Sequence, residues 1–206
     1  MITRIRRALL GAFALSLVVL TMPASAATEV GGVKYDDTAK VANQELKLNG
    51  AGIRYKAIFK VYAVGLYLSD KKATVADVLA ATGARRTQIV MLRDVTNEEF
   101  GAGFMGGVQK NTDRVEKAKL INQLLKLGEL FSTVPELKKG DTLTTDWVPG
   151  VGTVFQLNGK KIAEPMPDIA FYNAILRIWL GEKPIDAKLK HALLGEKVDE
   201  VKSGNN

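Results

Sequence analysis

The sequence predicts an α+β domain in which an antiparallel sheet carries helices on one face. Segments with strand character stand near both ends of the chain and helical segments are inserted between them, without a regular strand-helix alternation. Neither an internal repeat nor a long linker rich in proline, glycine or serine divides the chain. An apolar fraction of 47% in 206 residues is enough to bury one core. We therefore expect one domain over residues 27–195, between a leader at 1–26 and a polar tail at 196–206.

The leader has the features of a secretory signal peptide. Three arginines lie among the first seven residues, the apolar stretch Ala8–Met22 follows, and Ala24 and Ala26 supply the small residues of a cleavage site. The apolar stretch is shorter than the roughly 20 residues that a membrane-spanning helix needs. We expect cleavage after Ala26, export to the periplasm and no integral membrane span in the mature protein.

The composition excludes several classes of function. The chain has no cysteine, which excludes disulfides, thiol catalysis and sulfur-ligated metals, and the lone His191 excludes a histidine cluster for zinc or a histidine-based triad. Without the three arginines of the leader the net charge falls from +7 to +4, which is too small for a nucleic-acid-binding surface. We expect no metal, no cofactor and no nucleic acid, and protein partners stay open.

We predict the strands from segments in which apolar residues alternate with polar ones and which end at turn residues. Residues 28–37 predict a first strand, 44–70 a second and a long third strand, and 85–95 the next one. Two further strands, 141–148 and 152–162, are joined by a hairpin because "PGVG" stands between them.

The expected helices follow apolar spacing near 3.6 residues and capping residues. A short helix is expected at 74–82, and Thr96 with Glu99 three residues later predicts a capped start for a helix over 96–111. Residues 113–134 predict one continuous amphipathic helix, with its apolar side at Val115, Leu120, Leu124, Leu127 and Phe131. The last two helices, 168–181 and 186–195, each end at a glycine.

The stretch "GAGFMGG" places glycines along the helix that follows Thr96. It matches the spacing of a dinucleotide-binding loop, but Thr96–Phe100 separate the glycines from the preceding strand, and Glu98 and Glu99 would repel a pyrophosphate. Each glycine costs a helix about 1 kcal/mol relative to alanine. The glycine face therefore predicts either close packing or room for a ligand.

Arg54 stands in a segment otherwise dense in strand-forming residues. If the strand is unbroken, Arg54, Lys56 and Lys60 share a face with Tyr62 and Leu66, so that face begins cationic and ends apolar. In the first hypothesis the side chain of Arg54 is exposed to solvent, and the sequence pattern taken by itself favours this hypothesis. The other places Arg54 at the mouth of an apolar cleft, where its guanidinium can bind a carboxylate through two hydrogen bonds.

Three stretches of the chain resemble the chalcone isomerase-like family, in its bacterial exported branch: "LNGAGIRYKAIFKVYAVGLYL", "VPGVGTVFQLNGKKI" and "ILRIWLGEKPIDAKLKHALLG". The likeness spans nearly the whole chain after the leader. It implies an open-faced β-sandwich, in which helices are layered on a large antiparallel sheet and an apolar ligand cleft lies between them.

The resemblance also assigns roles to residues. Arg54 stands where the plant enzymes have a catalytic arginine, but Phe100, Gly107 and Ile178 replace their tyrosine, asparagine and threonine or serine, so we expect no efficient cyclisation of chalcone. Arg54 and Tyr62 match the arginine and tyrosine that hold a carboxylate in the family's fatty-acid-binding members. The expected ligand site is Arg54, Tyr62, Phe100, Phe104, Gly107 and Ile178, with Leu66 and Ile175 further along the pocket.

The leading functional hypothesis is an exported protein that binds a small apolar or carboxylate ligand, such as a fatty acid. The alternatives are an isomerase or intramolecular lyase that uses Arg54 as an electrophile, and a structural or partner-binding protein without a ligand. One geometric condition applies to the first hypothesis. A straight strand would separate Arg54 from Tyr62 by about 26 Å, so the chain must bend between Lys56 and Lys60 for both side chains to reach one ligand.

Overall fold

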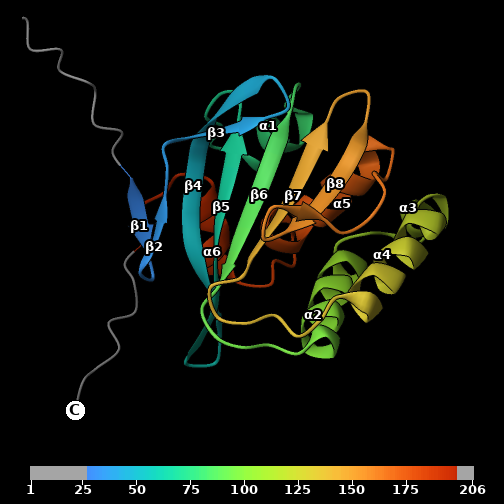
Figure 1. Ribbon diagram of the computed structural model, residues 1–206. Helices are drawn as coiled ribbons and strands as arrows, with labels where there is room; N and C mark the ends of the chain where they lie inside the picture. Colours follow the sequence, from blue (N-terminus) through green and yellow to red (C-terminus); the bar gives the residue numbers. More distant parts are fainter. Residues whose placement is uncertain (1–26, 199–206) are drawn as a thin grey trace, which may run out of the picture.

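The computed structural model describes residues 27–198, which form a curled antiparallel sheet with helices packed on one side (Figure 1). This arrangement confirms the predicted α+β fold class. The leader and most of the predicted tail lie outside the described residues. Within residues 27–198, no helix combines the length and the apolar character that crossing a bilayer requires.

The main sheet has seven strands, and each strand lies beside the next one in the sequence. The strands are β3 (Thr38–Val41), β4 (Gln44–Lys56), β5 (Phe59–Leu68), β6 (Arg85–Met91), β7 (Thr142–Val148), β8 (Gly152–Leu157) and β9 (Lys160–Lys161). The helices are α1 (Val75–Ala80), α2 (Asn97–Lys110), α3 (Arg114–Lys119), α4 (Ile121–Thr133), α5 (Ile169–Leu180) and α6 (Ala187–Leu193). A separate hairpin is formed by β1 (Thr28–Val30) and β2 (Val33–Tyr35).

The two faces of the sheet bury different sets of side chains, because successive residues of a strand point to opposite faces. On the helix side, Val64 and Leu66 of β5 belong to the large core that also contains Trp179 of α5. On the other side, Ala63 and Tyr67 of the same strand pack in a smaller core with residues of the β1–β2 hairpin. The large core fixes the positions of α2 and α5, which border the candidate site.

Residues 44–70 form two strands, and the chain bends between Lys56 and Lys60, as contact of Arg54 and Tyr62 with one ligand requires. The chain reverses at Ala57 and Ile58, so β4 and β5 form a hairpin in which Lys56 pairs with Phe59. Ala57 adopts a positive φ of 54°, a conformation that glycine or asparagine usually supplies in such turns. The sequence "KAIF" contains neither residue, so no local signal marks this turn.

Two other predicted elements are divided. The first strand, 28–37, is a hairpin because Gly31 and Gly32 both take positive φ values. The continuous helix over 113–134 is interrupted at Leu120, which separates α3 from α4, and Val115 is 65% exposed although it was expected on the apolar side. The capped start at Thr96 is confirmed, because its side chain accepts a hydrogen bond from the Glu99 N–H.

Helix α6 packs directly on the backbone of β4. The register between β4 and β5 shifts at Asn49, whose side chain bonds Lys72 and donates to the Leu193 carbonyl at 2.7 Å. A Cβ atom on Gly50 would lie 2.0 Å from the Ala192 carbonyl oxygen, so α6 approaches this closely only because residue 50 has no side chain. The bulge and the glycine together fix the end of α6 against the sheet.

We predict that Gly50→Ala lowers the free energy of unfolding by about 3 kcal/mol. This is near the upper end of the typical cost of adding atoms to a well-packed core, about 3 kcal/mol. Gly128→Ala is the matched control, because it lies inside α4 with nothing within 4 Å of the added Cβ. Helix propensity predicts that this control raises stability by about 1 kcal/mol. Urea unfolding of both variants tests the pair, and a Gly50→Ala protein as stable as the parent would contradict the close packing.

Candidate functional site

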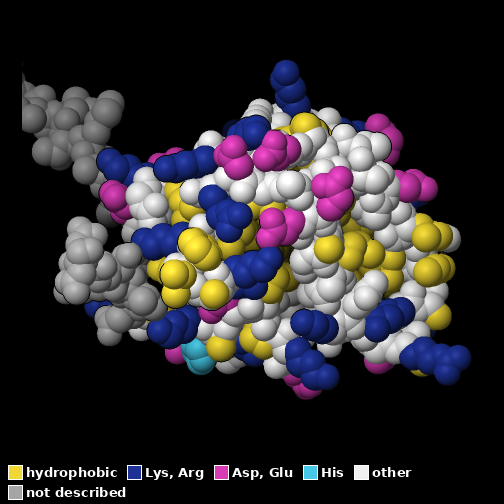
Figure 2. All heavy atoms as spheres, turned by 90° about the horizontal axis from the view of Figure 1, so that it is seen from below, with side chains coloured by type: hydrophobic (Ala, Val, Ile, Leu, Met, Phe, Trp, Pro, Cys, Tyr) yellow, Lys and Arg dark blue, Asp and Glu magenta, His cyan; other side chains and the backbone are white. Residues whose placement is uncertain are grey.

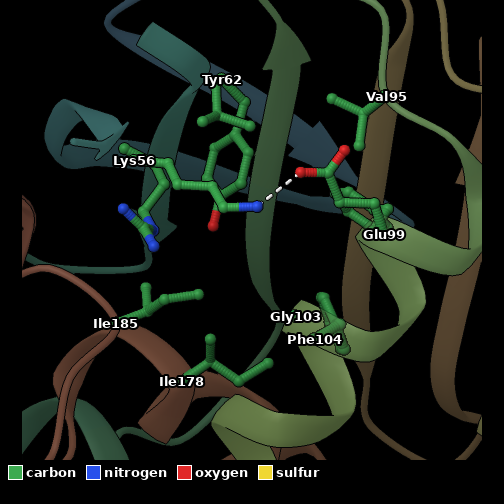
Figure 3. A pocket seen from close by; sticks show the side chains of 11 residues that line it. Lys56, Tyr62, Val95, Glu99, Gly103, Phe104, Ile178 and Ile185 are labelled. Atoms are coloured by element: carbon green, nitrogen blue, oxygen red, sulfur yellow. Dashed lines mark hydrogen bonds and ion pairs between the residues drawn. The ribbon is translucent and has the colours of Figure 1, made fainter. Parts of the chain in front are cut away.

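A pocket of about 120 Å³ lies between the sheet and α2, beside the β4–β5 turn (Figure 3). It brings together five of the six predicted site residues: Arg54, Tyr62, Phe100, Phe104 and Ile178. The lining is completed by Lys56, Val61, Val95, Glu99, Gly103 and Ile185. The pocket therefore has a few polar groups at the sheet and at the start of α2, and apolar walls elsewhere.

The hairpin places Arg54 directly opposite Tyr62 in the β4–β5 ladder. Side chains opposite each other on neighbouring strands have Cβ atoms roughly 4.5 to 5.5 Å apart, so the separation of about 26 Å expected for a straight strand does not occur. The register shifts again between Arg54 and Tyr55, which leaves Val61 as an extra residue in β5. Because of this bulge, Val61 and Tyr62 both line the pocket although they are consecutive.

The Tyr62 hydroxyl lies at the buried end of this pair. Its oxygen accepts a hydrogen bond of 3.0 Å from Nε1–H of Trp179. Burial raises the pKa of Tyr62 to about 12, although the Trp179 bond and the charge of Arg54 act in the opposite direction. The phenol is therefore neutral at physiological pH. Within residues 27–198 no group accepts its hydrogen, so the hydroxyl can donate to a ligand in the pocket.

Arg54 is partly buried at the pocket wall, contrary to the hypothesis of free solvent exposure. In the described part of the chain, no hydrogen bond or ion pair holds its guanidinium. The nearby Asp186 carboxylate is occupied by backbone groups, since it accepts from the Tyr55 N–H at 3.1 Å and caps α6 at the Leu189 N–H. The donors of Arg54 are therefore available to a ligand anion.

An ion pair crosses the pocket at its outer side. Lys56 of β4 and Glu99 of α2 point toward each other and meet at 2.6 Å (Figure 3). The lysine holds the pKa of the Glu99 carboxyl below its usual value. Because Lys56 compensates the charge of Glu99, the acid does not cancel the positive charge that Arg54 presents to the pocket.

Aromatic rings fill the space behind the pocket. The ring of Phe104 lies 5.9 Å from that of Phe100, 5.0 Å from that of Phe131 and 5.9 Å from that of Trp179. Leu66 and Ile175, which were expected to line the pocket, are buried in the same core but are not among its lining residues. The pocket is consequently shorter than predicted.

The glycine face of α2 serves both purposes that the sequence left open. A Cβ on Gly107 would lie 2.7 Å from Ile178, so this glycine permits close packing of α2 on α5, and it does not line the pocket. At Gly103 and Gly106 an added Cβ would have nothing within 4 Å. Gly103 thus leaves room at the pocket wall.

Comparisons with known proteins agree with this fold. A profile of the chalcone isomerase-like family matches residues 27–195. Among solved structures, a fatty-acid-binding protein of Arabidopsis thaliana is similar with a TM-score of 0.64 and 16% sequence identity, over 80% of this chain and 92% of the other. A search of curated proteins finds no match.

The bond between Tyr62 and Trp179 predicts a specific loss of stability. Tyr62→Phe leaves the buried Nε1–H of Trp179 without an acceptor, which costs about 1 to 3 kcal/mol in the free energy of unfolding. Tyr172→Phe is the matched control, because the buried Tyr172 hydroxyl has no partner in the described part of the chain. We expect the control to keep or raise stability in urea unfolding. Equal losses in the two variants would show that the bond does not hold β5 to α5.

Proposed function

The chain belongs to the chalcone isomerase-like family, and from this premise we propose that it binds a small apolar carboxylic acid in the pocket between β4, β5 and α2. The observation that carries the proposal is the pairing of Arg54 with Tyr62 on one wall of a largely apolar pocket. A guanidinium binds a carboxylate through charge-assisted hydrogen bonds. The neutral Tyr62 hydroxyl adds a donor beside it, so the polar end of the ligand lies at the sheet.

The dimensions of the pocket support a short or ring-sized apolar body. An apolar cavity of about 150 Å³ holds benzene, and the volume here is about 120 Å³. The similar Arabidopsis protein is by its name a fatty-acid-binding protein, which supports an acid as the ligand class. In the present chain Phe100 and Phe104 form walls of this pocket. A longer tail would have to extend into the adjoining hollow that shares Arg54, Gly103 and Ile185 with it, so we propose that short acids fill the pocket itself.

The same residues give less support to an enzyme. Arg54 could stabilise a developing enolate, but the helix positions expected to carry further polar groups are Phe100 and Gly107, and α5 contributes Ile178. Phe100 and Ile178 add apolar wall to the pocket, while Gly107 packs against Ile178 and brings no side chain. The pocket therefore suits recognition of an acid better than stabilisation of charge in a transition state.

We predict that Arg54→Ala weakens the binding of hexanoate, measured by calorimetry at neutral pH. The loss of a charged hydrogen bond corresponds to roughly 1.5 to 3 kcal/mol, or about 10- to 150-fold in Kd. Tyr62→Phe should weaken binding less, because the arginine retains the charge interaction. Hexanamide, which lacks the negative charge, should bind weakly to the parent protein and show little change in Arg54→Ala.

Lys126→Ala is the control for this experiment, because it removes an exposed cation on α4 away from the pocket. Its Kd for hexanoate should equal that of the parent. Unchanged hexanoate affinity in Arg54→Ala would remove the basis of the proposal. Saturable cyclisation of chalcone that disappears in Arg54→Ala would favour the enzyme instead.

We further propose that the protein works outside the cytoplasm in a form that begins at Ala27. The charged and apolar features of residues 1–26 support this proposal, and so does the start of the family match at residue 27. N-terminal sequencing of the protein from a periplasmic extract should begin at Ala27. A chain that still begins at Met1 would contradict it.

A further inference from the structure

The β4–β5 turn carries two large apolar side chains that the fold leaves outside its cores. Ile58 is 84% exposed and Phe59 is 59% exposed. The turn projects beyond the sheet at the lower end of the molecule in Figure 1. Single exposed apolar residues are common on protein surfaces, but two neighbours on a projecting turn form a continuous apolar tip.

Cationic side chains stand around this tip. Lys56 pairs with Phe59 across the turn, Lys60 follows Phe59 directly, and the guanidinium of Arg93 lies 6.0 Å from the centre of the Phe59 ring. Figure 2, which views this end of the molecule, shows hydrophobic side chains with lysines and arginines around them and acidic side chains among these cations. The tip is therefore amphipathic, with apolar groups at its end and positive charges at its base.

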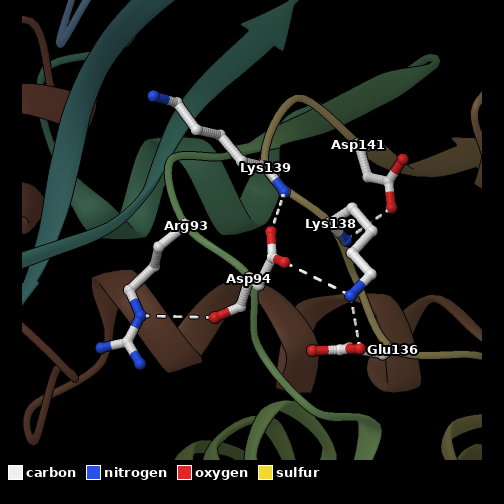
Figure 4. Close-up of polar contacts among 6 residues, drawn as sticks. All are labelled: Arg93, Asp94, Glu136, Lys138, Lys139 and Asp141. Carbon is white, nitrogen blue, oxygen red and sulfur yellow. Dashed lines mark hydrogen bonds and ion pairs between the residues drawn. The ribbon is translucent and has the colours of Figure 1, made fainter.

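Two acids near the tip, Glu99 and Asp94, already have cationic or backbone partners. Glu99 is paired with Lys56. Asp94 is bonded by Lys138 at 3.3 Å and by the Lys139 N–H at 2.8 Å (Figure 4). These contacts compensate the carboxylates beside the turn and hold the connection that carries Arg93 in place.

We propose that the β4–β5 turn docks on the surface of an anionic lipid bilayer. Ile58 and Phe59 enter the boundary between headgroups and acyl chains, while Lys60 and Arg93 contact lipid phosphates and Lys56 stays paired with Glu99. Apolar groups combined with cations are what anionic membrane surfaces attract. A stable protein contact needs roughly 800 Å² from each partner, and two side chains on a convex turn supply only a small part of that area.

Docking would place the mouth of the pocket at the membrane, since Lys56 belongs both to the turn and to the pocket lining. An apolar acid could then pass between bilayer and pocket over a short path. The docking itself requires no ligand and so goes beyond the proposed binding of an acid. The vesicle-binding experiment can fail while the calorimetric experiment on acid binding succeeds, and calorimetry can fail while vesicle binding is observed.

The test is co-sedimentation with vesicles of phosphatidylcholine alone and of equal parts phosphatidylcholine and phosphatidylglycerol. The protein begins at Ala27, so that the apolar leader cannot bind lipid, and this form contains every described helix and strand. Ile58→Asp removes half of the tip. Val151→Asp is the matched control, because it adds the same charge at a 52% exposed apolar residue in the β7–β8 turn at the opposite end of the sheet.

We expect the parent and Val151→Asp to bind the anionic vesicles equally, and Ile58→Asp to bind them at least about tenfold more weakly, as expected for loss of more than 1.4 kcal/mol of insertion. Added salt should weaken the binding, and phosphatidylcholine vesicles should retain little protein. Equal binding by Ile58→Asp, or an equal loss in Val151→Asp, would overturn the proposal. Absence of vesicle binding together with self-association that Ile58→Asp abolishes would assign the tip to a protein contact instead.

Discussion

The register between β4 and β5 is the constraint on which the candidate site depends. A turn of two residues, with Ala57 at positive φ, sets which residues of the two strands face each other. A one-residue slip would move side chains of one strand to the opposite face, and Arg54 would then no longer share a wall with Tyr62. The bulge at Val61 adjusts this register so that two consecutive residues of β5 line the pocket.

The contacts that preserve this register are buried or partly buried and come from distant parts of the chain. The Trp179 bond ties Tyr62 to α5, and the Asn49 side chain ties the other bulge of the hairpin to the end of α6. Asp186 joins the start of α6 to the backbone of Tyr55, next to Arg54. These bonds fix the backbone on both sides of the arginine while its own donors remain open to the pocket. A polar pair oriented before the ligand arrives loses less freedom on binding.

Much of the fold could be predicted from local patterns. The alternation of apolar and polar residues predicted β6 and β7, and the turn residues "PGVG" predicted the hairpin between β7 and β8. The capping residue Thr96 predicted the start of α2. The turn at Ala57 could not be predicted in the same way, because its conformation is imposed by strand pairing and cores on both faces rather than by a turn residue. The break at Leu120 also lacks a glycine or proline to mark it.

The candidate site, like the fold, could be predicted only in part. The resemblance placed Arg54, Tyr62, Phe100, Phe104 and Ile178 around one pocket, whereas the depth of that pocket depends on how Phe131 and Trp179 pack behind it, which no local pattern reveals. The most direct measurement is a crystal structure of the protein with a bromine-labelled hexanoic acid, located by anomalous scattering. We expect the carboxylate within hydrogen-bond distance of the Arg54 guanidinium and the Tyr62 hydroxyl, with bromine toward Phe104. A ligand whose carboxylate lies elsewhere, with Arg54 still unoccupied, would contradict it.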